Sequence, residues 1–249
     1  MLNKVPEVVF FFWVIKIMAT TVGETAADFL NVNLNFGLTN TSIVMGVLLL
    51  TVLFIQMRAR RYIPSIYWGV VVLLSIFGTL ITDNLVDNLG VSLETTTAVF
   101  SAALLATFAA WFASEKTLSI HTIHNTRREL FYWTTILFTF ALGTAAGDLA
   151  AEGMQLGYAT SALIYGGLIG AVTLAYYVFK ANAIWAFWIA YVLTRPFGAS
   201  CGDFLSQSTA DGGLGLGTVG TSVIFLVTIF GLVSYLSMCQ RKLRIARNY

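Results

Sequence analysis

Charged residues are scarce in this chain. They make up 10% of its 249 residues, whereas soluble proteins average about 25%. Hydrophobic residues make up 57%, and no stretch is long and polar enough to form a soluble domain of its own. The composition therefore predicts a membrane protein. The first apolar run leads into polar residues without an A-x-A-like cleavage site, so we expect no cleaved signal peptide.

Cysteine and histidine are also rare, with two residues each. Cys201 and Cys239 lie far apart and should face opposite sides of the membrane, which argues against a structural disulfide. His121 and His124 have a metal-like spacing, but their loop offers no acidic or cysteine partner nearby, so we expect no metal there. No nucleophile–base arrangement, nucleotide-binding loop or haem-like histidine pair occurs at a common membrane depth. We therefore expect that the protein is not an enzyme.

Long apolar runs, in contrast, are abundant. A membrane-spanning helix needs about 20 mostly apolar residues to cross a hydrocarbon core of roughly 30 Å. The runs also lack the strict alternation of a membrane barrel. They predict an all-α membrane protein with eight transmembrane helices. The runs lie near residues 8–29, 42–57, 66–86, 95–113, 131–150, 160–179, 184–204 and 219–238.

Lysine and arginine are absent from every second loop between these runs. Twelve of the 14 basic residues precede the first run or follow an even-numbered one, and Lys16 and Arg195 fall inside spans. The positive-inside rule then makes both termini cytoplasmic. We interpret the basic tail, residues 241–249, as a topology determinant that contacts anionic lipid, and we expect no nucleic acid as partner.

A motif recurs four times. Each odd-numbered run has a tryptophan ten residues before a glycine and 15 residues before an aspartate, the pattern W-x9-G-x4-D. The motif residues are Trp13, Trp68, Trp133 and Trp188, then Gly23, Gly78, Gly143 and Gly198, then Asp28, Asp83, Asp148 and Asp203. Each repeat has two spans, so all four should enter the membrane in the same direction, related by an axis along the membrane normal. We expect one transmembrane domain over residues 1–240, with repeats near 8–57, 64–114, 129–180 and 183–238.

Four segments resemble a known family. They are FFWVIKIMATTVGETAADF, IYWGVVVLLSIFGTLITD, FYWTTILFTFALGTAAGD and AFWIAYVLTRPFGASCGD. They are similar to bacterial multi-pass membrane proteins built from four tandem copies of a two-span, tryptophan-containing repeat of unknown function. The resemblance covers about residues 8–238. It implies a multi-pass protein of the bacterial cytoplasmic membrane, and it implies no activity.

The motif positions have separate interpretations. The tryptophans suit interface anchors or packing residues, and the glycines, each with a small residue four positions on, favour close helix packing in lipid. At 100° per residue, the position four before each aspartate shares its helix face. This position holds Glu24, Thr79, Thr144 and Ala199.

The aspartates are the candidate site. Ionisable residues at membrane depth usually face a bundle interior and mark ion pathways, although a carboxylate solvated at the mouth of a loop is the alternative. We predict that Asp28, Asp83, Asp148, Asp203, Glu24, Thr79 and Thr144 bind a cation. Asp87 and Glu152, four residues after two of the aspartates, form a secondary acidic set that repels the first.

Two basic residues lie within the spans. Lys16 is one turn past Trp13, so we expect its side chain to snorkel to the cytoplasmic interface. Arg195 lies deeper, just before Pro196, which should kink the helix or free a carbonyl group. We expect Arg195 to point inward and to form an ion pair with an acidic residue of another span.

These patterns favour transport of a small cation. Carboxylates and hydroxyls are hard donors that suit Mg²⁺, Mn²⁺, Ca²⁺, Na⁺ or H⁺ better than copper or zinc. The leading hypothesis is a proton-coupled exporter of a divalent metal ion of the Mn or Mg type, with a bound divalent cation as its sole cofactor. The alternatives are an exporter of an organic cation or small amphiphile, and a non-catalytic structural or sensory protein. Spacing leaves open whether the repeats enclose an axis, and what the oligomeric state is.

Overall fold

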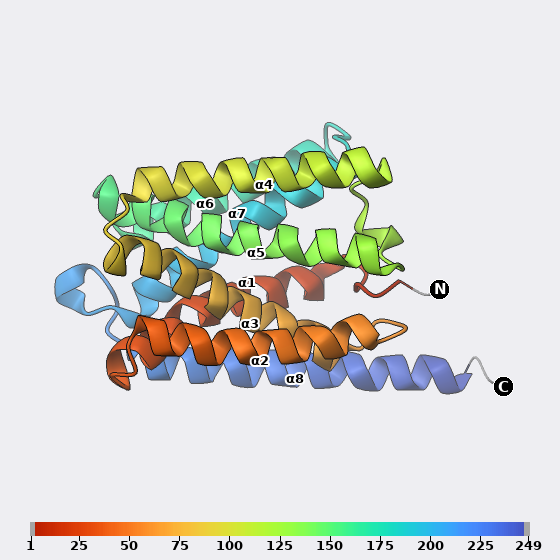
Figure 1. Ribbon diagram of the computed structural model, residues 1–249, viewed down its shortest axis with the longest axis horizontal. Helices are drawn as coiled ribbons and strands as arrows, with labels where there is room; N and C mark the ends of the chain where they lie inside the picture. Colours follow the sequence, from red (N-terminus) through yellow and green to blue (C-terminus); the bar gives the residue numbers. More distant parts are fainter. Residues whose placement is uncertain (1–2, 247–249) are drawn as a thin grey trace.

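The computed structural model describes residues 3–246, apart from the side chains of Val32 and of residues 240–246. These residues form eight α-helices along the long axis of the molecule, without a strand (Figure 1). The helices are α1 (Phe10–Asp28), α2 (Leu38–Arg58), α3 (Pro64–Asp83), α4 (Leu93–Glu115), α5 (Thr126–Asp148), α6 (Tyr158–Tyr177), α7 (Ala183–Ser206) and α8 (Gly217–Ala246). The predicted all-α architecture is therefore confirmed.

Seven of the eight described helices are long and apolar enough to cross a membrane. The exception is α7, which has 24 residues but carries Arg195 and Pro196 near its middle. Both residues lower its mean hydropathy. Its length thus suits the span predicted near residues 184–204, while its composition departs from that of the other seven helices.

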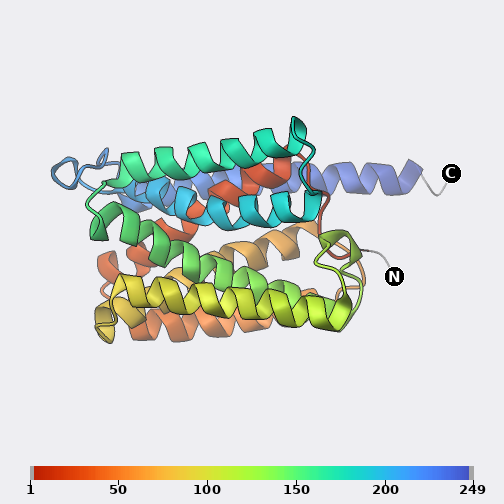
Figure 2. The ribbon, with the colours of Figure 1, turned by 90° about the horizontal axis from the view of Figure 1, so that it is seen from above.

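The helices form two layers (Figures 1 and 2). In the inner layer α1 contacts α3, α3 contacts α5, α5 contacts α7, and α7 contacts α1 again. In the outer layer α2, α4 and α6 each pack against the inner helix that follows in sequence, and α8 packs mainly against α1. The outer helices expose many large apolar side chains, as expected of a surface that meets lipid. The four inner helices form a closed ring.

Local sequence explains several helix boundaries. Pro64 begins α3, where its missing N–H leaves no donor unsatisfied. The side chains of Asn125 and Asn182 accept hydrogen bonds from the first turns of α5 and α7. Gly37 and Gly157 precede α2 and α6 with φ angles of 77° and 76°, a conformation that glycine adopts without steric penalty. Their matching places in the first and third repeats indicate two similar halves.

Three inner helices continue beyond their motif aspartate as a single π-helical turn. These turns are Phe29–Asn33 after Asp28, Asn84–Asn88 after Asp83, and Leu149–Gly153 after Asp148. Such turns are rare and often occur at functional sites. Helix α7 instead passes Asp203 and ends at Ser206 without one, so the fourth repeat differs from the others.

The motif glycines lie where neighbouring inner helices come closest. A Cβ added to any of them would crowd a side chain of the next helix in the ring. In ring order, Gly23 faces Ser75, Gly78 faces Phe140, Gly143 faces Arg195, and Gly198 faces Thr20. Each facing residue lies three positions before the next motif glycine. One small-residue contact of the kind found between membrane helices thus recurs four times.

Replacing Gly23 by Ala should destabilise the protein, because the new methyl group must displace Ser75 of α3, and such overpacking costs about 1–3 kcal/mol. The matched control is Gly170→Ala in α6, where an added Cβ meets no atom. There the change should stabilise the helix by up to about 1 kcal/mol. Thermal unfolding in detergent should therefore shift in opposite directions for the two variants. A shift in the same direction for both would contradict the ring packing.

Candidate functional site

The guanidinium of Arg195 joins α7 to the other three inner helices. The side chain is fully buried. Its Nη2 donates to Glu24 Oε2 of α1 at 2.8 Å and to Thr144 Oγ1 of α5 at 2.6 Å. The same nitrogen donates to Thr79 Oγ1 of α3. The inward-pointing ion pair that we expected of Arg195 is present, with Glu24 as its partner.

The three acceptors hold the same position in their repeats, directly after the motif glycine. In the fourth repeat this position holds Ala199, which has no polar side-chain atom, and the arginine comes from that repeat instead. Glu24, Thr79 and Thr144, which we predicted to bind a cation, thus all face an internal guanidinium. Because the three side chains converge on one nitrogen, the ring brings equivalent positions of the repeats together.

Three carboxylates gather beside this guanidinium. Oxygen atoms of Glu24, Asp148 and Asp203, from α1, α5 and α7, lie within 4.8 Å of one another, a spacing that could hold a metal ion. Glu24 and Asp203 are buried, and Asp148 is half-buried. Among the side chains that the structure describes, none forms an ion pair with Asp148 or Asp203. When ionised, the three carboxylates exceed the one guanidinium by two negative charges. We call Glu24, Asp148 and Asp203 the carboxylate cluster.

The other predicted acidic residues lie outside this cluster. Asp28 and Asp83 are half-buried and remain within electrostatic range of Glu24. Asp87 and Glu152 are exposed, and Glu152 accepts a hydrogen bond from the hydroxyl of Tyr158 at 3.0 Å. Two of the four motif aspartates thus contribute to the three-carboxylate group, and two stand near it.

Lys16 does not snorkel to the membrane interface, contrary to our expectation. It is fully buried, and its Nζ donates to Thr194 Oγ1 at 3.2 Å. The same nitrogen lies 4.3 Å from the ring centre of Tyr191 and 4.5 Å from that of Phe140. The reason is the position of Lys16 around the axis of α1. Lys16 precedes Gly23 by seven residues, about two helical turns, so it shares the face of α1 that points into the ring.

The motif tryptophans are mainly packing residues, and the interface-anchor interpretation is wrong for three of them. Trp68, Trp133 and Trp188 are only 2–3% exposed, while Trp13 is half-buried. An aromatic residue directly precedes each tryptophan, a repeated pair that sequence reasoning overlooked. These residues are Phe12, Tyr67, Tyr132 and Phe187. Their rings pack on the tryptophans of neighbouring repeats, so each inner helix contributes to one aromatic cluster near its N-terminal end.

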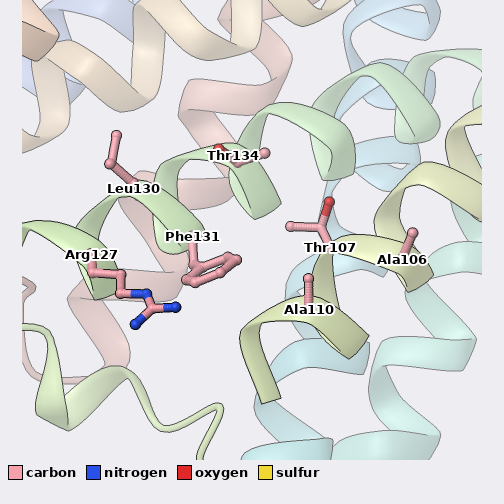
Figure 3. A pocket seen from close by; sticks show the side chains of 7 residues that line it. All are labelled: Ala106, Thr107, Ala110, Arg127, Leu130, Phe131 and Thr134. Carbon is pink, nitrogen blue, oxygen red and sulfur yellow. The ribbon is translucent and has the colours of Figure 1, made fainter. Parts of the chain in front are cut away.

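A shallow groove of about 450 Å³ lies on the outside of the bundle, between α4 and α5 (Figure 3). It is lined by Ala106, Thr107 and Ala110 of α4 and by Arg127, Leu130, Phe131 and Thr134 of α5. None of the clustered carboxylates borders it, so the groove is separate from the candidate site.

Two expectations concern the remainder of the chain. Cys201 and Cys239 are unpaired. Helix α8 extends into the basic tail as far as Ala246, but the side chains of residues 240–246 and the whole of residues 247–249 lie outside the described part of the chain. The predicted lipid contact of the tail stays a prediction.

Comparison with known proteins identifies the repeat as one that a family model describes. No curated protein and no solved structure matches the chain. A family model described as a Repeat of Unknown Function (DUF347) matches it four times, at residues 11–62, 66–117, 131–182 and 186–242. Each match includes one inner helix and the outer helix that follows it. The chain therefore belongs to the DUF347 repeat family, of which it carries four tandem copies.

Proposed function

We propose that the protein is a transporter that exports a divalent cation of the Mn²⁺ or Mg²⁺ type across the bacterial cytoplasmic membrane. The observation that carries this proposal is the carboxylate cluster, whose oxygens from three inner helices lie within 4.8 Å of one another. Burying several carboxylates within membrane-spanning helices is unfavourable unless a cation or protons neutralise them. Such groups mark ion pathways more often than they stabilise a fold.

The chemistry of the cluster favours a hard divalent ion. All three donors are carboxylate oxygens, the ligands that Mg²⁺ and Mn²⁺ prefer. The two negative charges left over after pairing with Arg195 match a doubly charged ion. Neither cysteine belongs to the group, which disfavours copper and zinc.

The proposal includes four parallel repeats with both termini cytoplasmic and the carboxylates toward the outer face. Ring contacts near the starts of the inner helices support it, with centroids 5.6 Å apart for Phe12 and Trp68 and 5.4 Å apart for Tyr67 and Trp133. The distribution of basic residues supports the orientation. In a variant without native cysteines, an impermeant thiol reagent added outside cells should label a cysteine at Gly90 but not one at Arg60. The reverse labelling would invert the orientation.

The packing of the ring disfavours an organic cation or amphiphile as substrate. Such a ligand needs a wide cavity, commonly several hundred Å³ in volume. The motif glycines instead bring neighbouring inner helices into close contact. The aromatic residues near the helix starts pack on one another, so they offer no free aromatic walls for an organic cation.

Ion flux through purified protein in proteoliposomes tests the proposal. We expect Mn²⁺ or Mg²⁺ to move down an imposed gradient with protons moving in the opposite direction, and Zn²⁺ to move much more slowly. Empty liposomes and protein with all four motif aspartates changed to Asn are the controls. If the wild-type protein moves none of these ions, the structural or sensory alternative becomes the better explanation.

A further inference from the structure

The surroundings of Lys16 are unusual for a lysine. The side chain is fully buried, yet no ion pair within the described residues involves it. Its polar partner is the hydroxyl of Thr194, and the faces of Tyr191 and Phe140 cover the nitrogen. Aromatic faces and one hydroxyl compensate only part of the cost of burying an ammonium group. The site can therefore hold the lysine in either protonation state.

The other repeats show that the fold does not need a charge here. The position seven residues before the motif glycine holds Val71, Ile136 and Tyr191 in the second, third and fourth repeats. All three are buried in the ring. A lysine at the first of these positions is thus an addition to the repeat, which argues for a role beyond packing.

A short chain of contacts links Lys16 to the carboxylate cluster. Lys16 donates to Thr194, the next residue is Arg195, and Arg195 holds Glu24. Two cationic side chains, Lys16 and Arg195, thus lie between the carboxylate cluster and the starts of the inner helices. A divalent ion bound there would add two positive charges in surroundings where charges interact far more strongly than in water. The ammonium group of Lys16, without a carboxylate of its own, is the group that this added charge would most readily deprotonate.

We propose that Lys16 is the proton-binding site of the transporter, which gives up its proton when a divalent cation occupies the carboxylate cluster and regains it when the cation leaves. This inference rests on the proposed function and names the group that couples the two ions. One proton passes from the ammonium group to water for each cation bound, and the same proton is taken back on release. Arg195 stays charged throughout and serves as the fixed counter-ion of Glu24.

The groups that face Lys16 are consistent with this assignment. Helix α7 contributes the ring of Tyr191 and the nearby charge of Arg195, and α5 contributes Phe140, which has no charge. No residue of α8 between 217 and 239 is charged. The hydroxyl of Tyr191 is buried without a hydrogen-bond partner.

Toward the helix starts, two further buried tyrosines follow Tyr191. Tyr191 and Tyr132 both pack on Trp188, and the hydroxyl of Tyr132 is 2.5 Å from that of Tyr67. Buried tyrosines thus lie between Lys16 and the end of the ring opposite the carboxylates, which is the cytoplasmic end in the proposed orientation.

Calorimetric titration with MnCl₂, in buffers of different ionisation enthalpy at one pH, counts the protons released when the ion binds. We expect purified wild-type protein to release about one proton more per Mn²⁺ than Lys16→Met, because metal binding displaces bound protons. Lys16→Met should still bind Mn²⁺. Val71→Met, the same replacement at the equivalent position of the second repeat, should release as many protons as the wild type.

A second variant separates proton exchange from a need for positive charge. Lys16→Arg keeps the charge but cannot lose it near neutral pH, so it should release about one proton fewer than the wild type, as Lys16→Met does. It also keeps the measurement decisive if Lys16→Met does not fold. If Lys16→Met or Lys16→Arg binds Mn²⁺ and releases as many protons as the wild type, Lys16 is not the proton-binding site, while the proposed function still stands. An absence of Mn²⁺ binding by the wild type would overturn the proposed function as well.

Discussion

Replacing Asp148 or Asp203 by Asn is expected to lower the affinity for Mn²⁺ by more than about 100-fold, since residues that merely support metal ligands already contribute about 10- to 100-fold. Each change removes one of the three carboxylates whose oxygens converge within 4.8 Å. Asp28→Asn and Asp83→Asn remove charges that stand outside this group. Their effect should stay below about 10-fold, the range of longer-range charge interactions. Titration of the purified variants with Mn²⁺, followed by electron paramagnetic resonance, gives the four affinities.

The relative Mn²⁺ affinities of the four Asp→Asn variants distinguish the carboxylate cluster from a symmetric ring of four aspartate ligands. The motif treats the four aspartates as equivalent, and an equal loss in all four variants would favour a symmetric ring of ligands over the carboxylate cluster. Asp211→Asn provides the control, because Asp211 is an exposed acid in a loop outside the inner helices. If Asp148→Asn and Asp203→Asn bind Mn²⁺ as the wild type does, the carboxylate cluster is not the binding site.

Replacing Arg195 by Ala is expected to lower the free energy of unfolding by about 3–5 kcal/mol, the usual effect of leaving one partner of a buried ion pair alone. The change removes the one nitrogen donor that Glu24, Thr79 and Thr144 share. It also leaves the carboxylate of Glu24 without a counter-ion in the ring. Reversible unfolding in mixed micelles with increasing sodium dodecyl sulfate measures the loss.

Two further variants show whether the loss comes from the buried ion pair. Arg127→Ala should change stability by less than about 0.5 kcal/mol, because Arg127 is 69% exposed and lies 3.8 Å from Glu115. Combining Arg195→Ala with Glu24→Ala should recover part of the loss, since no unpaired charge then stays buried. If Arg195→Ala and Arg127→Ala lower the free energy of unfolding equally, the buried ion pair of Arg195 does not contribute the expected stability.

The transmembrane runs and the repeat were predictable from the sequence because both are one-dimensional signals. Hydropathy locates a run whatever it packs against, and the spacing of Trp, Gly and Asp needs no knowledge of neighbouring helices. Closure of the ring was not predictable in this way. It depends on which side of α1 meets α7, and residues far apart in sequence, such as Thr20 and Gly198, determine that contact.

The site was predicted in part. The inward orientation of Arg195 follows from its depth, because a guanidinium in mid-membrane has few other stable environments. The predicted orientation of Lys16 was wrong because it followed only from the depth of the residue in the membrane. Its helical phase relative to Gly23 distinguishes the ring interior from lipid, and applying the same criterion to the residue before each tryptophan would have indicated the aromatic cluster.

The closed ring has a consequence for the kind of gene that can encode it. A ring of identical subunits would place the same residue at every equivalent position, so an arginine on the shared axis would appear two or four times, and its copies would repel one another. Joining four diverged repeats in one polypeptide removes this constraint. One repeat can then supply the arginine, another the lysine, and the remaining two small or apolar side chains. Fusion of duplicated segments thereby permits a single, off-symmetry charge at the centre of an otherwise regular assembly.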